Sequence, residues 1–279
     1  MLRALIAAPA LAVAIAAAAP SQAADAQLQK AVANPARAEE HKARDKWRHP
    51  TETLAFWGLK PGQTVIELSP GSGYWTEILA PYAKATGGAY VTTGADLENP
   101  ATSEGARRGR AAFEAKYADA AKWGPVKVVN FGPQAKPLGA PASADMVITA
   151  RNIHNFMYQQ GMLDKVMKDA YDVLKPGGVL AVEEHRADPR PETPGVTDGY
   201  VAMKTVVAAA EKAGFKLAAQ SEVNANPKDT KDHPFGVWTL PPVRRSAAPG
   251  QAADPNFDRT KYDAIGESDR MTLRFVKPA

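Results

Sequence analysis

The chain has 279 residues, and its 34 Lys and Arg against 30 Asp and Glu give a net charge of +4. It has no cysteine, which excludes disulfides and thiolate metal sites. The small basic excess is not gathered into long Lys/Arg runs, so the basic stripe typical of nucleic-acid-binding proteins is not evident. We therefore expect no nucleic-acid partner.

The first residues have the pattern of a secretory signal peptide. Arg3 precedes an Ala-rich apolar stretch over residues 4–19, and small residues surround Ala23 and Ala24. The stretch is shorter and less apolar than the ~20 strongly apolar residues of a membrane span. We predict a signal peptide over 1–24, a single mature domain over 25–279 with no membrane span after cleavage, and a periplasmic or secreted location.

Strand and helix patterns alternate through the mature chain. Strands are expected at 64–68, 89–93, 126–131, 144–149, 179–183, 215–221 and 270–276. Helices are expected at 26–33, 36–48, 51–57, 74–82, 99 to about 121, 162–174 and 197–213. This alternation predicts an α/β domain with a mostly parallel seven-stranded sheet and helices on both faces.

Two regions depart from the alternation. A helical arm precedes the first strand over 25–60, and a long insertion rich in Pro, Gly and polar residues covers 224–269 before the last strand. Trp238 and Leu240 indicate that the insertion is packed rather than an open loop.

A loop rich in small residues joins the first strand to its helix, with the sequence Glu67-Leu68-Ser69-Pro70-Gly71-Ser72-Gly73. Such residues let the backbone approach a ligand, and the helix start offers free N–H groups. A dinucleotide site needs a third glycine at the position of Thr76, so a dinucleotide oxidoreductase is disfavoured.

This loop resembles the first motif of class I S-adenosylmethionine-dependent methyltransferases, an acidic residue followed by x-Gly-x-Gly-x-Gly. Glu67, Gly71 and Gly73 match the motif, whereas Ser69 and Pro70 replace its first glycine and the next residue. The Leu-Lys-Pro-Gly turn at 59–62, Asp145 and the Leu-Lys-Pro-Gly-Gly run at 174–178 stand in the order expected for the superfamily.

The mature chain is also similar, over nearly its whole length, to a set of predicted exported bacterial methyltransferases; 47–50 and 236–242 are among the stretches that carry this likeness. The resemblance implies a Rossmann-like methyltransferase fold and S-adenosylmethionine as the cofactor. It leaves the substrate open.

The resemblance also implies roles for single residues. Ser69, Pro70, Gly71 and Gly73 would line the methionine end of the cofactor, and Glu67 would lie near its amino group. The alternative for Glu67 is that it only accepts hydrogen bonds within the turn.

The resemblance also implies that two further residues contact the nucleoside end of the cofactor. An acidic residue at the end of the second strand should hold the ribose hydroxyls; Gly94 aligns with that position, and Asp96, two residues later, is the candidate. Gly132, after the third strand, would lie beside the adenine.

The ends of the fourth and fifth strands carry further polar residues, at the sheet edge where open α/β sheets bind ligands. Asn152 can hydrogen-bond to cofactor or substrate. His154 is a candidate general base, the alternative being a histidine that only packs locally. Glu183, Glu184 and His185 have the chemistry of metal ligands but no recognisable spacing, so we predict no metal.

The arm carries a dense polar group. His41, Arg44, Asp45 and Arg48 follow the spacing i, i+3, i+4, i+7, which places them on one face of the helix expected at 36–48. We expect a solvated face with salt bridges.

These patterns lead to a first functional hypothesis: methyl transfer from S-adenosylmethionine to an O, N or S nucleophile on a small molecule. The export signal favours an alternative, because S-adenosylmethionine is made in the cytosol. The protein would then be an exported, non-catalytic binding protein that retains the methyltransferase fold.

Overall fold

The structure is a computed structural model, and it describes residues 25–188 and 197–279. The predicted signal peptide over 1–24 lies outside the described residues. Within the described part of the chain, no helix is long and apolar enough to cross a membrane.

One sheet forms the centre of the molecule, with the strand order β3-β2-β1-β4-β5-β7-β6. The strands are β1 (Thr64–Leu68), β2 (Ala89–Ala95), β3 (Lys127–Phe131), β4 (Ala144–Ala150), β5 (Leu174–His185), β6 (Lys216–Ser221) and β7 (Arg270–Val276). Neighbours pair in parallel except β7, which is antiparallel to β5 and β6. The predicted mostly parallel seven-stranded sheet is confirmed.

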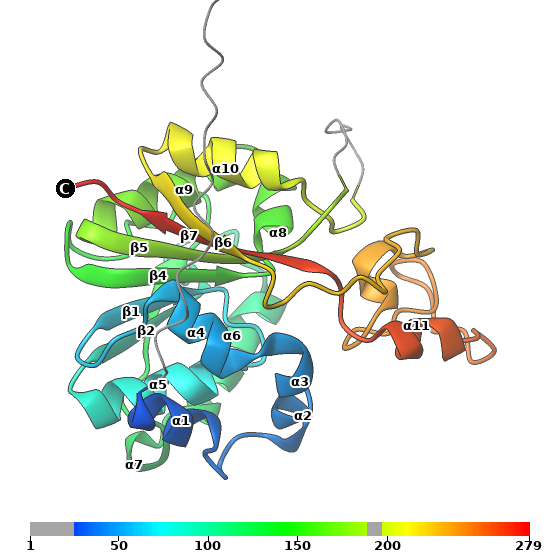
Figure 1. Cartoon of the computed structure of the whole chain (residues 1–279), viewed down its shortest axis with the longest axis horizontal. Helices are drawn as coiled ribbons and strands as arrows, with labels where there is room; N and C mark the ends of the chain where they lie inside the picture. Colours follow the sequence, from blue (N-terminus) through cyan, green and yellow to red (C-terminus); the bar gives the residue numbers. More distant parts are fainter. Residues whose placement is uncertain (1–24, 189–196) are drawn as a thin grey trace, which may run out of the picture.

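Helices cover both faces of this sheet, as predicted (Figure 1). One layer contains α1 (Ala26–Val32), α4 (Pro50–Trp57), α5 (Thr76–Thr86) and α7 (Ala120–Trp123). The other contains α8 (Ile153–Met157), α9 (Met162–Val173) and α10 (Met203–Lys212). The remaining helices are α2 (Glu39–Lys42), α3 (Asp45–Arg48), α6 (Glu104–Lys116), the 3-10 helix η1 (Gly236–Thr239) and α11 (Thr260–Ile265).

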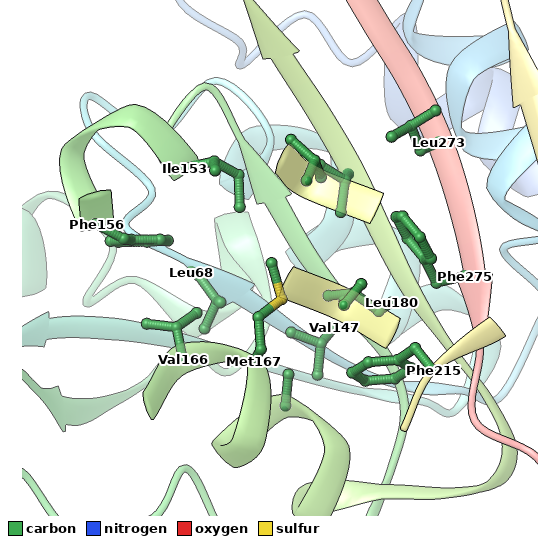
Figure 2. Packing of buried hydrophobic residues seen from close by; sticks show 14 of the residues in the cluster. Leu68, Val147, Ile153, Phe156, Val166, Met167, Leu180, Phe215, Leu273 and Phe275 are labelled. Atoms are coloured by element: carbon green, nitrogen blue, oxygen red, sulfur yellow. The ribbon is translucent and has the colours of Figure 1, made fainter. Parts of the chain in front are cut away.

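Alternating side chains of the strands fill two cores, one on each face. In β1, Ile66 and Leu68 pack with Val147 and the α8–α10 layer, while Val65 faces the α5 layer. Figure 2 shows Leu68 and Val147 in the first of these cores. Successive strand residues point to opposite faces, and a parallel sheet covered on both sides is apolar on both. Glu67 is therefore carried to the buried α5 face, where an acidic side chain needs partners.

Several predicted helices differ from those observed. The helix expected at 36–48 is wrong: α2 and α3 are separate, because buried tertiary contacts of His41 and Arg48 override the local preference for helix. The helix expected at 99 to about 121 is divided into α6 and α7. The one expected at 197–213 begins at Met203.

A buried network of charges joins the arm, the sheet and the insertion. We call it the arginine–glutamate network; it consists of Arg44, Arg48, Arg151, Arg270, Glu183 and Glu267. The Glu267 carboxylate accepts from Arg44 Nε at 2.6 Å, Arg48 Nε at 3.0 Å and Arg270 Nη1 at 2.5 Å. These contacts hold the insertion against α3 and β7.

The second carboxylate of the network belongs to β5. Glu183 Oε2 accepts from Arg151 Nη1 at 3.1 Å. Its Oε1 lies 2.9 Å from Arg270 Nε, a charge contact whose angle does not make a hydrogen bond. Burial alone would raise the pKa of Glu267, but the charges of Arg270, Arg44 and Arg151 hold that pKa below its ordinary value. Glu267 therefore acts as a buried anion.

The network fixes where the insertion lies. In Figure 1 the insertion extends past the carboxyl ends of β4 and β5, and the arm helices α2 and α3 lie below it. The edge of the sheet that binds ligands in open α/β folds is thus bordered by chain segments from both ends of the sequence.

We predict that Glu267→Gln destabilises the fold strongly. Removing one partner leaves buried guanidinium charges uncompensated, which costs about 3–5 kcal/mol, and this would be measured as the free energy of unfolding in urea. Glu222→Gln is the matched control, because the Glu222 side chain is 66% exposed in its pair with Arg186 and such pairs contribute at most about 1 kcal/mol. Equal effects of the two substitutions would contradict the role of the network.

Candidate active site

The loop after β1 makes a tight turn between strand and helix. Gly71 has a φ of 59°, and a Cβ there would meet nothing within 4 Å, so the loop borders open space at this point. Gly73 has a φ of 96°, and a Cβ there would lie 1.8 Å from the Tyr117 hydroxyl oxygen. The two glycines therefore have different roles. Gly71 leaves open space beside the loop, and Gly73 permits close packing against Tyr117 at the end of α6.

Two cavities open at the carboxyl edge of the sheet. The central cavity has about 260 Å³ and lies between the loop, the arm and the insertion, with Gly71, Arg44 and Trp238 in its walls. The outer cavity has about 360 Å³ and lies over the ends of β2 and β3. Ser69, Asn152 and Asn155 line both, so the two cavities adjoin each other beside the loop.

The structure brings together most of the residues singled out in the sequence. The central cavity is lined by Glu67, Ser69, Pro70, Gly71, Asn152 and His154. The outer cavity is lined by Asp96 and Gly132 together with Ser69 and Asn152. Gly73 lines neither cavity, since it packs against Tyr117.

Glu67 is buried under the loop with one oxygen bonded. Its Oε2 accepts from the hydroxyls of Tyr90 and Thr76, the latter at 3.1 Å. Burial raises the pKa of Glu67 to about 7, although both hydrogen bonds and the charge of Arg151 oppose the rise. Within the described residues, Oε1 has no protein donor, so the carboxyl group can serve both the turn and a ligand.

Asp96 follows directly on β2, because that strand runs two residues beyond its predicted end. Its Oδ1 accepts from the Glu98 N–H at 3.0 Å. No donor within residues 25–188 and 197–279 contacts Oδ2. The carboxylate is thus fixed by the turn, with one oxygen left for the outer cavity.

Asn152 ties the ends of two strands together. Its amide nitrogen donates to the carbonyls of Leu68 at 3.3 Å, Ser69 at 3.2 Å and Ala150 at 3.0 Å. It thereby holds Ser69, whose φ of 50° is unusual for a residue other than glycine. Only the amide oxygen of Asn152 remains for the ligand contact that the sequence suggested.

His154 is held by a carboxylate from the neighbouring strand. Glu184 Oε1 accepts from His154 Nδ1 at 2.9 Å, and Oε2 accepts from the His154 backbone N–H at 3.2 Å. A carboxylate at Nδ1 favours the tautomer in which Nε2 carries a lone pair. In a cavity wall, this is the arrangement of a general base and its orienting acid.

The sequence did not reveal Glu184 as the partner of His154. Residues 30 positions apart meet only because β4 and β5 pair in register, Ala150 with Glu183. His154, Glu184 and His185 offer possible metal-ligand atoms within 4.8 Å of one another. Glu184 Oε1 also accepts from the His185 N–H at 2.8 Å, however, so hydrogen bonds within the protein already occupy both its oxygens. This arrangement fits an orienting carboxylate better than a metal ligand.

Two of the four residues in the polar group on the arm are buried, so the expected solvated face is wrong for them, although the expected salt bridges are present. His41 and Arg48 are each 1% exposed. His41 contacts Glu77 at 2.9 Å through Nδ1 and the Ser72 hydroxyl at 2.9 Å through Nε2. Burial would raise the pKa of Glu77, but hydrogen bonds from His41, the Ala38 N–H and Lys116 lower it to about 2. These contacts hold the arm against the loop after β1.

The strand order, the antiparallel β7 and the cavities at the carboxyl edge together define a Rossmann-like methyltransferase fold. Residues 40–221 match the model of the ubiE/COQ5 methyltransferase family, and the chain belongs to this family. The predicted cofactor, S-adenosylmethionine, is confirmed by this membership. No curated protein matches the chain.

Solved structures support the fold. The [4+2]-cyclase SpnF has a TM-score of 0.57 and 15% identity, covering 90% of this chain and 92% of the cyclase. Geranyl diphosphate C-methyltransferase from Streptomyces coelicolor A3(2), solved with S-adenosyl-L-homocysteine, has a TM-score of 0.52 and 13% identity, covering 88% and 84%. One of the two is a cyclase, so the reaction has to be argued from the site and not from the fold.

The raised pKa of Glu67 makes stability depend on pH. Its pKa rises from 4.5 to about 7 on folding, so the unfolded chain ionises first as pH increases. Stability falls between these values, by up to about 3 kcal/mol from pH 5 to pH 8. Glu67→Gln removes the titration, so we expect its unfolding free energy to change less over this range.

Chemical unfolding at pH 5 and pH 8 tests this, with Glu98→Gln as a control on an exposed carboxylate. If wild type and Glu67→Gln show the same pH dependence, Glu67 does not titrate in this range.

Proposed function

We propose that the protein is an S-adenosylmethionine-dependent methyltransferase that acts on a small-molecule acceptor. The observation that carries the proposal is that the two cavities share Ser69 and Asn152 in their walls. Asp96, whose carboxylate would bind the nucleoside part of the cofactor, lines one cavity, and His154, the candidate base, lines the other.

The chain's own groups fit the cofactor. Asp96 Oδ2 would accept from the ribose hydroxyls, and Gly132 leaves room beside the adenine. The open side of Gly71 would accommodate the methionine end, and Glu67 Oε1 would accept from its amino group. When bound, S-adenosylmethionine supplies an activated methyl group on a sulfonium.

The protein's task is mainly alignment. Holding the acceptor nucleophile in line with the methyl group supplies much of the rate, because it removes the entropy cost of a bimolecular step. His154 Nε2 would take the proton of an acceptor hydroxyl or amine as it attacks. Glu184, bonded to Nδ1, would orient the ring and stabilise the imidazolium.

We expect Asp96→Asn to weaken binding of S-adenosylhomocysteine at least about tenfold. The substitution removes a charge-assisted acceptor of the ribose hydroxyls while keeping the turn. Calorimetric titration measures the affinity, and Glu98→Gln is the control because the Glu98 carboxylate is paired at the surface with Lys136.

The same titration with NAD separates the reaction classes, since a dinucleotide enzyme would bind NAD more tightly. Unchanged affinity of Asp96→Asn for S-adenosylhomocysteine would reject the assignment of the outer cavity. Binding of S-adenosylhomocysteine without turnover on any acceptor would favour the non-catalytic binding protein.

Glu184→Gln should release the His154 ring from its Nδ1–H tautomer. Nitrogen NMR of the imidazole reads this directly, with the Nδ1–H form dominant in the wild type and a mixture in the variant. With an acceptor identified by release of S-adenosylhomocysteine, we expect His154→Asn to lower turnover about 10²–10⁴-fold.

Affinity for S-adenosylhomocysteine should stay within about twofold in both variants. A wild-type enzyme with His154 in the Nε2–H form would rule out the base. Equal turnover of His154→Asn would do the same.

A further inference from the structure

We propose that the acceptor is a small organic acid, whose anionic group is bound by Arg44 and Arg151 while its apolar body lies against the insertion. This rests on the proposed function, since the acid would lie in the central cavity beside the methyl donor. It names a class of substrate that the fold and the family leave open.

The two arginines are only partly used by the protein. Arg44 donates through Nε to Glu267, and Arg151 donates through Nη1 to Glu183. Within the described parts of the chain, no acceptor contacts the two terminal nitrogens of Arg44 or Nη2 of Arg151. Both side chains line the central cavity and are about one-fifth exposed there. Their free N–H groups suit the two oxygens of a carboxylate.

Positive charge exceeds negative charge at this wall. The arginine–glutamate network sets four guanidinium groups against two carboxylates. Burial lowers the pKa of Arg44, and the charges of Arg151 and Arg270 lower it further, against the attraction of Glu267. An anion brought into the cavity would offset this repulsion.

Arg48 adds charge to the wall without adding donors. Its Nη1 and Nη2 are buried with no hydrogen-bond partner among the described residues, and its guanidinium lies 4.4 Å from the centre of the Tyr74 ring. The aromatic face stabilises the cation in place. Arg48 therefore adds positive charge beside Arg44 and Arg151 without binding the ligand itself.

The insertion contributes apolar residues to the cavity wall. Trp238, Leu240, Pro242 and Val243 of the insertion line the cavity, and the His154 and Trp238 rings are 5.9 Å apart. Binding pockets combine such apolar walls with a few polar groups that orient the ligand. The cavity of about 260 Å³ must also hold the methionine end of the cofactor, so the acid is small.

The competing role for Arg44 is to bind the carboxylate of the cofactor's methionine. The experiment therefore uses protein saturated with S-adenosylhomocysteine, in which that carboxylate is already in place. Benzoate and its neutral isostere benzamide are the probes. Tryptophan fluorescence reports binding, because Trp75 and Trp238 line the cavity.

We expect benzoate to bind at least about tenfold more tightly than benzamide, and Arg44→Met to abolish this preference. Glu267 keeps Arg48 and Arg270 in the variant, so the fold should remain intact, as thermal unfolding would show. Arg108→Met, an exposed arginine on α6, makes the same change in net charge and should leave the preference unchanged.

The outcomes separate this inference from the proposed function. Equal affinity for the two probes, or an Arg44→Met variant that loses S-adenosylhomocysteine affinity but keeps the benzoate preference, would overturn the inference alone. A wild-type protein that does not bind S-adenosylhomocysteine would overturn the proposed function and the inference with it.

Discussion

The pairing of Glu267 and Glu183 with buried arginines is the constraint on which the site depends. Glu267 belongs to the insertion, Glu183 to β5, and their partners to the arm, to β7 and to the end of β4. Ion pairs of this kind are costly to desolvate and stabilise little in total, but breaking one leaves a charge stranded in the interior. The network therefore selects one arrangement of arm and insertion over the sheet edge, because any other would separate buried charges.

This arrangement turns an open sheet edge into a walled cavity. In the parallel part of the sheet the strands end together at that edge, but the sheet alone offers only their loops as ligand contacts. The arm adds Arg44, and the insertion adds Trp238 with its apolar neighbours. Ser69 and Arg151 have φ angles of 50° and 59°, an unusual conformation that Asn152 and the Glu183 carbonyl maintain through hydrogen bonds. Unusual backbone conformations of this kind persist where surrounding contacts fix them, which is common at binding sites.

The sequence predicted the sheet well because the apolar runs and turns that define a strand lie within a few residues of one another. Apolar runs and their turns placed β1 and β7 at their observed bounds, and the loop after β1 identified Glu67 and Gly71 as cavity residues. The arm was predicted poorly for a physical reason. His41, Arg44 and Arg48 have helical spacing, and spacing cannot distinguish a solvated charged face from one buried against Glu77 and Glu267. Glu77 lies 36 positions from His41, and Glu267 lies 223 and 219 positions from Arg44 and Arg48. Only the tertiary fold brings these residues together.

The same distinction explains why the candidate base, His154, was visible in the sequence and its partner Glu184 was not. His154 follows β4 and could be placed at the sheet edge from the strand pattern alone, whereas the role of Glu184 depends on the register between β4 and β5. Its two oxygens are engaged by His154 and the His185 N–H, which leaves Nε2 as the His154 ring nitrogen that is not bonded to Glu184. His154 lines the same cavity as Arg44 and Arg151. A sulfonium donor is cationic, so an acceptor that arrives as an anion is attracted both by the arginines and by the reagent it attacks. The charge that positions the substrate and the charge that activates the methyl group thus favour the same class of molecule.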